Sequence, residues 1–268
     1  MLECVVNISE GRRPDVVAGI AAAAGPHLLD VHTDAHHHRS VLTLLGEEAP
    51  RAVAEAAVAA LDIRGHTGAH PRIGVVDVVP FVPIAGASLA DAVAARDRFA
   101  AWAGDRLGLP CFRYGPLSGG DRTLPELRRR AFADLVPDTG PARPHPTAGA
   151  VAVGAREVLV AFNLWLAEPD LAVARRLAAE LRGPAVRALG LAVGDGVQVS
   201  VNLLDPGGVG PADVFDAVAA RTPVARAELV GLLPRSVLQM VPPERWGQLD
   251  LGEDHTIEAA LARAGQPG

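Results

Sequence analysis

Histidine is the side chain of this sequence best suited to chemistry, and it is unevenly distributed. Six of the nine histidines lie between positions 32 and 70, as His32 with His36–His38, and then His66 with His70. Histidine titrates near neutral pH, so a histidine held in a cleft can carry a proton to or from a reacting group. The two clusters therefore point first to acid–base chemistry, while the HHH run on its own is also typical of a solvated turn.

The second histidine cluster lies in a glycine-rich segment, Arg64–Gly74, with the sequence RGHTGAHPRIG. Glycine allows a close backbone approach to a ligand, and Pro71 restricts the backbone directly after His70. On a helix, the four-residue spacing of His66 and His70 would suit a metal ion. The glycines and Pro71 disfavour a helix, and no carboxylate has ligand spacing nearby. We therefore expect no metal site, with a histidine-rich metal protein kept as an alternative.

The composition excludes several other chemistries. All 25 basic residues are arginine, so a lysine Schiff base and a phosphate-binding P-loop lysine are ruled out. The net charge of −6 argues against nucleic acid as a partner. Two cysteines, Cys4 and Cys111, are too few for a disulfide framework. Because the sequence also lacks a signal-peptide pattern and an apolar run of about 18 residues, we expect a cytoplasmic protein without a membrane segment.

The elements that must position these residues follow from hydrophobic periodicity. In the first half, the pattern predicts strands over residues 2–8, 28–33, 40–45 and 75–84, and helices over 14–24 and 49–61. The order is β-α-β-β-α-β. A helix over 89–107 and an irregular stretch over 115–149 follow it.

The second half repeats this order. Strands are predicted over residues 158–166, 186–193, 197–204 and 228–233, helices over 169–181 and 211–220, and a last helix within 251–268. Gly194–Asp195–Gly196 is a strong hairpin signal between two of these strands. The sequence therefore predicts an α+β protein of two ferredoxin-like β-α-β-β-α-β subdomains, residues 1–153 and 154–268, with facing sheets and a cleft between them.

Five segments resemble, in order, the signature stretches of the glutamate formiminotransferase family, which in vertebrates forms the N-terminal part of formiminotransferase-cyclodeaminase. They are CVVNISEG from Cys4, HTGAHPRIGVVDVVPFVPI from His66, GAREVLVAFN from Gly154, QVSVNLLD from Gln198 and LVGLLP from Leu229. The resemblance covers residues 2 to about 235. It implies two α/β subdomains whose sheets face each other, and we expect no cyclodeaminase part.

The resemblance implies transfer of a formimino group from N-formimino-L-glutamate to tetrahydrofolate, the co-substrate, giving 5-formimino-tetrahydrofolate and glutamate. The family's catalytic histidine matches His70. Arg39 and Arg72 match family arginines and are expected to bind substrate carboxylates, with His38 and His66 beside them. The family's folate-binding stretch matches Gly140, Pro141, Ala142, Arg143, Pro144, His145, Pro146, Thr147, Ala148 and Gly149. The expected partners are these two small molecules, and a homodimer is left open.

The sequence departs from the family at two informative positions. Ala69 replaces the acidic residue that usually precedes the catalytic histidine, and Ala148 replaces an aromatic residue of the folate stretch. Without an acidic neighbour, His70 is expected to titrate not far above about 6.5. The departures leave two alternatives open: a homologue that binds a folate-like ligand without catalysis, and a transferase that takes its one-carbon group from formylglutamate or another donor.

Overall fold

The structure, a computed structural model, describes residues 1–266. The chain forms two compact units, Met1–Glu157 and the residues from Val158 onward, and each unit carries its own sheet. The α+β class predicted from the sequence is confirmed. The boundary expected between residues 153 and 154 falls inside strand β6 (Val151–Ala155), which belongs to the sheet of the first unit.

The first unit contains a six-stranded sheet with the order β2-β3-β1-β4-β6-β5. Its other strands are β1 (Leu2–Ile8), β2 (Leu28–Asp34), β3 (Arg39–Leu45), β4 (Val76–Pro83) and β5 (Cys111–Tyr114). The four predicted strands, β1 to β4, pair antiparallel in the order of a ferredoxin-like unit. Strands β6 and β5 extend this sheet beyond β4 in parallel, and neither was predicted.

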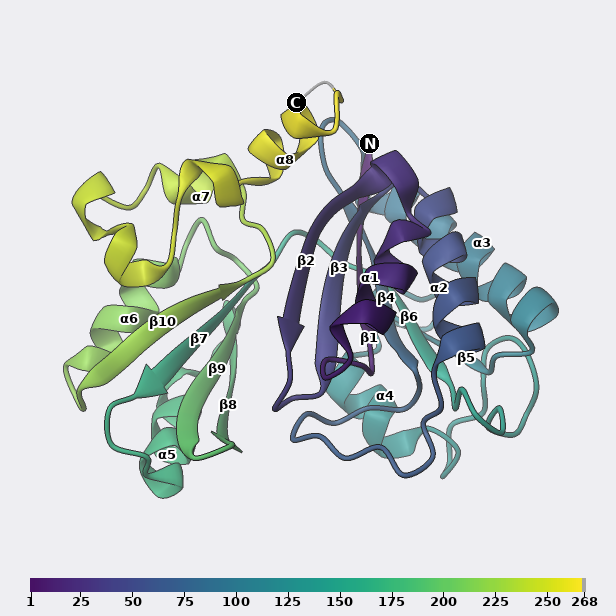
Figure 1. The fold of residues 1–268 in the computed structure, drawn as a ribbon, viewed down its shortest axis with the longest axis horizontal. Helices are drawn as coiled ribbons and strands as arrows, with labels where there is room; N and C mark the ends of the chain where they lie inside the picture. The colour runs from purple at the N-terminus through teal and green to yellow at the C-terminus, as the bar shows by residue number, and fades with distance from the viewer. Residues whose placement is uncertain (267–268) are drawn as a thin grey trace. The chain divides into compact units, whose positions relative to one another are not determined.

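Helices α1 (Pro14–Ala22), α2 (Glu48–Ala60) and α3 (Leu89–Leu107) lie together beside one face of this sheet (Figure 1). Their apolar side chains, such as Val53 and Phe99, form the main core with Leu42 and Val79 of the strands. A smaller core on the opposite face of the sheet contains Phe112 of β5 and Leu127 of α4 (Leu124–Arg130). The sheet therefore separates a large apolar core from a second layer that contains α4.

Helix α3 has the bounds that the sequence predicts because both of its ends are capped. The Ser88 side chain accepts from the backbone N–H of Asp91, and the Asp91 carboxylate accepts from the backbone of Ser88, which is a capping box. At the other end Gly108 takes the left-handed conformation, with φ 61°. These local signals need no tertiary information, so the helix can be located from sequence alone.

The second unit is a four-stranded antiparallel sheet with the order β10-β7-β9-β8. Its elements in chain order are β7 (Val160–Leu166), α5 (Leu171–Leu181), β8 (Val186–Val193), β9 (Gly196–Leu203), α6 (Pro211–Ala219) and β10 (Val224–Val230). The predicted β-α-β-β-α-β order is confirmed, including the hairpin at Gly194–Gly196. The last strand lies earlier than predicted, because Gly231 turns the chain with φ 81°.

Short helices follow the second sheet. They are α7 (Arg235–Leu238) and α8 (Ile257–Arg263), with 3-10 turns between them at Pro243–Arg245, Gly247–Leu249 and Glu253–His255. The last helix predicted within 251–268 corresponds to α8, and residues 267–268 lie outside the described residues. Over residues 1–266, none of the helices has the length and apolar character needed to cross a membrane.

Candidate active site

Asp77 is the buried polar residue on which the site is built. It lies in β4 at a point where the pairing with β1 changes register, because Ile8 is opposite Val76 whereas Asn7 is opposite Val78. A β-bulge of this kind inserts one extra residue and changes the direction of nearby side chains. The side chain of Asp77 is fully buried. The bulge thus allows an acidic residue inside an otherwise apolar strand.

Two arginines from different elements donate to the carboxylate of Asp77. Arg39 Nη1 of β3 lies 2.7 Å from Oδ2, and Arg128 Nη2 of α4 lies 2.5 Å from the same oxygen. The backbone N–H of Ile73 donates to Oδ1 at 2.7 Å. Burial alone would raise the pKa of Asp77, but the two guanidinium groups outweigh burial and hold that pKa below its usual value. Asp77 therefore joins β3, α4 and the loop that carries His70.

His70 is half-buried beside this group. Its Nδ1 lies 2.8 Å from the carbonyl oxygen of Pro71. Because a carbonyl can only accept, Nδ1 carries the proton and Nε2 keeps its lone pair in the neutral ring. Burial, followed by the positive charges of Arg39 and Arg128, lowers the pKa of His70 to about 3. The pKa of His70 near 6.5 that the sequence predicts is therefore wrong. The sequence does not reveal the two charges, because Arg39 and Arg128 are distant from His70 along the chain.

Arg72 ties the loop of His66 and His70 to the turn between β2 and β3. Its Nη2 donates to the carbonyl oxygens of His37, at 3.1 Å, and His70, at 2.6 Å, while Nη1 contacts the ring of His66. Gly68 leaves space for this guanidinium, since a Cβ there would come within 2.6 Å of Nη2. The close approach that this glycine permits is therefore to Arg72 of the same chain.

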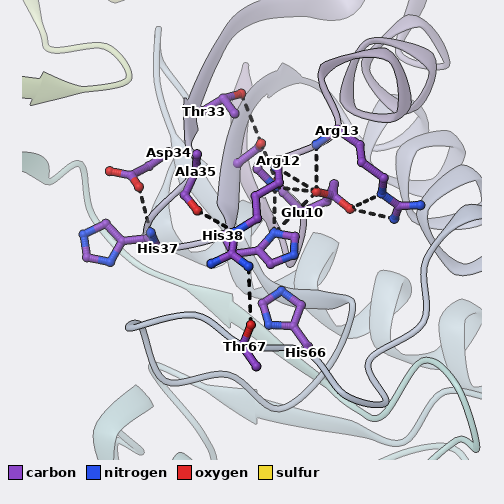
Figure 2. A network of polar contacts seen from close by, with 12 residues as sticks. Glu10, Arg12, Arg13, Thr33, Asp34, Ala35, His37, His38, His66 and Thr67 are labelled. Carbon is purple, nitrogen blue, oxygen red and sulfur yellow. Dashed lines mark hydrogen bonds and ion pairs between the residues drawn. The ribbon is translucent and has the colours of Figure 1, made fainter. Parts of the chain in front are cut away.

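The rings of His38 and His66 stack, with centroids 4.1 Å apart (Figure 2). The backbone N–H of Gly11 donates to Nδ1 of His38 at 3.1 Å, so the proton of the neutral ring lies on Nε2. Burial lowers the pKa of His38, and Glu10 offsets this only in part. Burial and the charge of Arg72 lower the pKa of His66 to about 4. Both rings are therefore neutral at physiological pH.

Glu10 is a second buried carboxylate, and it holds the turn before α1 in place. Its Oε1 accepts from the backbone N–H groups of Gly11, Arg12 and Arg13 at 3.0, 2.8 and 3.1 Å. Burial raises the pKa of Glu10, but these hydrogen bonds outweigh it and keep the pKa below its usual value. Arg12 donates in turn to the hydroxyl of Thr67 at 3.3 Å (Figure 2). This network joins the turn before α1 to both histidine clusters.

A cavity of about 220 Å³ opens at this network, lined by Ser9, Glu10, Arg13, His38, Leu61, Asp62, Arg64, Gly65 and His66. A larger one of about 630 Å³ lies between α3, β5 and the loop 116–122. Its arginines are paired with carboxylates, as Arg122 is with Asp138 at 2.7 Å, and none of the histidines lines it. We place the candidate site at the histidines for this reason. No group of three or more histidine, cysteine or acidic side chains in residues 1–266 is arranged to hold a metal ion.

The segment Gly140–Gly149 reaches the site at its C-terminal end. Val75 lies five residues after His70, and its backbone N–H donates to the carbonyl of Ala148 at 2.9 Å. Ala148 itself is 1% exposed and packs in the main core. Its side chain therefore offers no surface on which a ring could stack. The exposed residues of the segment are Gly140, Pro141, Ala142, Arg143, Pro144 and Pro146, and its half-buried ones are His145 and Thr147.

The far end of this segment is held by α3. Gly140, with φ 80°, packs so closely that a Cβ would overlap the carbonyl of Leu109. The backbone N–H of Cys111 donates to the carbonyl of Thr139 at 2.9 Å. The segment thus runs from the end of α3 to the loop after His70.

The structure brings five predicted residues into one connected group: His70, Arg39, Arg72, His38 and His66. Three residues of this group escaped the sequence reasoning: Asp77, Arg128 and Glu10. The signal for Asp77 is a single acid inside the apolar run VVDVV. Arg128 gives no comparable signal, because the run LRRR is typical of a solvated helix face.

Comparison with known proteins agrees with this arrangement. Residues 1–156 match the family described as "Formiminotransferase domain, N-terminal subdomain". The chain is 35% identical over 232 residues to the glutamate formimidoyltransferase of Streptococcus pyogenes serotype M1, covering 76% of this chain and 78% of that protein. It is 31% identical over 272 residues to the enzyme of the same name from Thermoplasma acidophilum, covering 89% of each.

A longer relative is the formimidoyltransferase-cyclodeaminase of Sus scrofa, 31% identical over 306 residues, where the match covers 99% of this chain but 56% of that protein. The family match spans more than half of the chain. The chain also covers more than two thirds of the length of two relatives to which it is more than 30% identical. The chain therefore belongs to the formiminotransferase family.

Proposed function

We propose that this protein transfers the formimino group of N-formimino-L-glutamate to N5 of tetrahydrofolate, releasing glutamate and 5-formimino-tetrahydrofolate. Relatives named glutamate formimidoyltransferase support this activity. The single observation in the structure that carries it is the state of His70. The ring is neutral, its Nδ1 is committed to the carbonyl of Pro71, and Nε2 retains a lone pair.

His70 is the proton carrier of the proposed reaction. As N5 of the folate attacks the carbon of the formimino group, Nε2 of His70 takes the proton from N5. The tetrahedral intermediate then collapses when the bond to the glutamate nitrogen breaks, and the same Nε2 returns a proton to that nitrogen. One group suffices for both transfers because the proton taken in the first step is the one given in the second.

The charges around His70 suit substrates that carry carboxylates. Burial, together with the charges of Arg39 and Arg128, lowers the pKa of His70 to about 3 in the protein alone, which makes the ring a weak base. A bound carboxylate offsets that positive charge and raises the pKa of His70 toward its ordinary value. Base strength thus increases when substrate is present, which is when the reaction needs it.

The remaining contribution is positioning. Arg39 and Arg72 are proposed to orient substrate carboxylates, with His38 and His66 at the rim of the cavity. The segment Gly140–Gly149 is proposed to bind the folate with its exposed and half-buried residues. Ala148 contributes through its backbone, since its side chain is buried.

The test is a coupled assay with formiminoglutamate and tetrahydrofolate, read as 5,10-methenyl-tetrahydrofolate after acid treatment. Product that depends on both substrates and on active protein supports the proposal. Product from formylglutamate but not from formiminoglutamate would show that the one-carbon donor is formylglutamate instead. Binding of tetrahydrofolate without turnover of either donor would contradict catalysis.

A further inference from the structure

Arg128 differs from the arginines next to it at the end of α4. Arg130 forms ion pairs along the helix surface, and Arg129 is exposed. Arg128 instead directs its guanidinium to Asp77, and 17% of its side chain is exposed. Helix α4 therefore contributes one cation to the group around His70.

The hydrogen bonding of Arg128 is incomplete. Its Nη2 donates to Asp77, whereas its Nε is buried and has no acceptor among residues 1–266. A buried N–H of a charged group that lacks an acceptor is costly, and such groups usually have a partner. The Nε of Arg72 is in the same situation within the described chain. Each of the two guanidinium groups thus has an N–H donor that still lacks an acceptor.

Positive charge exceeds negative charge around His70. Arg39 and Arg128 act on its ring together with one carboxylate, that of Asp77, and Arg72 is bonded to its carbonyl oxygen. Three guanidinium groups and one carboxylate give a net charge of +2 (3 − 1), and the neutral ring adds nothing. A surplus of this size suits a ligand that carries carboxylates.

We propose that Arg128 is a substrate-binding residue that holds a carboxylate of a glutamate moiety beside His70. The inference rests on the proposed function, in which glutamate carboxylates occur on formiminoglutamate and on the glutamyl tail of tetrahydrofolate. Asp77 takes one hydrogen of Nη2 of Arg128 and fixes the plane of the guanidinium. Nε–H and the second hydrogen of Nη2 lie on one edge of the group and are left to bind the carboxylate as a pair.

The experiment compares Arg128→Gln with Arg129→Gln, which removes the same charge from the next, exposed position. Each variant is assayed with formiminoglutamate against formiminoglutamine and formiminoisoglutamine, in which one carboxylate is an amide. Each is also assayed with tetrahydrofolate against tetrahydropteroate, which lacks the glutamyl tail. Wild type should prefer the intact substrate, and Arg128→Gln should reduce that preference in kcat/KM by about 10- to 100-fold for one pair. Arg129→Gln should leave every preference unchanged.

The pair whose preference is reduced identifies whether the donor or the folate supplies the carboxylate. An equal loss for intact and truncated substrates in every pair would overturn the proposal, since that is what a purely structural role of Arg128 produces. Arg128→Lys keeps the charge and a bond to Asp77 but not the planar pair of donors. It should fold like wild type and still lose most of the preference.

Calorimetric titration with glutarate separates this proposal from the proposed function. Wild type and Arg129→Gln should bind this dicarboxylate alike, and Arg128→Gln should bind it about 10- to 100-fold more weakly. If that difference is found in a protein without transferase activity, the carboxylate site stands and the proposed function fails. If glutarate binds both variants equally, the assignment of Arg128 is wrong even when the transferase is active.

Discussion

Replacing Asp77 by asparagine should destabilise the first unit strongly while changing the shape of one side chain very little. The carboxylate is fully buried and accepts from Arg39, Arg128 and the backbone of Ile73. Asparagine keeps one acceptor oxygen, turns an NH2 group toward the guanidinium groups and leaves two cations without a counter-charge. Breaking a buried ion pair from one side costs roughly 3–5 kcal/mol. Because Arg128 is partly exposed and can turn toward water, we expect about 3 kcal/mol.

Urea unfolding at pH 7 measures this loss as a change in the free energy of unfolding. Asp105→Asn is the matched control, because Asp105 is exposed on α3, and it should change that free energy by less than about 0.5 kcal/mol. A loss at Asp77 below about 1 kcal/mol, or equal to that of the control, would refute the reasoning, since the carboxylate would then not hold the two cations.

The pH dependence gives an independent check. The pKa of Asp77 is lower in the folded protein than in the unfolded chain, so the unfolded chain binds the proton more readily. The stabilisation by Asp77 is therefore complete above the unfolded pKa of about 3.9 and is lost as the pH falls through the folded value. The difference between wild type and Asp77→Asn should be constant from about pH 5 to pH 8 and should shrink in stronger acid.

Three further predictions concern single residues. His70→Ala should lower turnover in the coupled assay by roughly 10²–10⁴-fold with a much smaller change in KM, and wild-type turnover in the variant would move the proton carrier elsewhere. Burial raises the pKa of Glu3 to about 7, so the folded protein binds this proton more tightly and its stability falls as the pH rises from about 4.5 through 7. Glu3→Gln should therefore stabilise by about 2–3 kcal/mol more at pH 8 than at pH 5 in urea unfolding, and an equal effect at both would contradict the raised pKa. Ala148→Trp should destabilise by at least about 1–3 kcal/mol, measured by thermal unfolding, because Ala148 is closely packed in the core.

Much of the fold is encoded locally and can be predicted. The hairpin at Gly194–Gly196 and the capped helix α3 depend on residues next to each other, and both are found where the sequence places them. Strands β5 and β6 are different, since they have four and five residues and β6 contains a glycine. Runs this short show no alternation, and it is pairing with β4 and with each other that makes them strands.

The site was predictable in its parts but not in its electrostatics. The glycine-rich segment around His66 and His70 and the resemblance to a known family predict which loop carries the candidate catalytic histidine. The low pKa of His70 depends on burial and on the charges of Arg39 and Arg128, which lie on β3 and α4. A charge that acts through space cannot be seen from sequence neighbours, so both the pKa of His70 and the proposed role of Arg128 require the fold.

The position of β6 between β4 and β5 has a consequence for the order in which a newly made chain can fold. While the protein is being synthesised, β4 is complete at Pro83, but β6, its parallel partner, begins only at Val151. Until then the outer edge of β4 is open, and the loop after His70 lacks the backbone partners that Ala148 and Ala150 provide. Open edges invite pairing with other chains, and proline weakens such pairing because it has no N–H to donate. Pro83, whose missing N–H faces the same edge as the carbonyl of Phe81, therefore helps to protect the half-made sheet during synthesis. The loop that carries His70 is among the last parts of the first unit to become fixed.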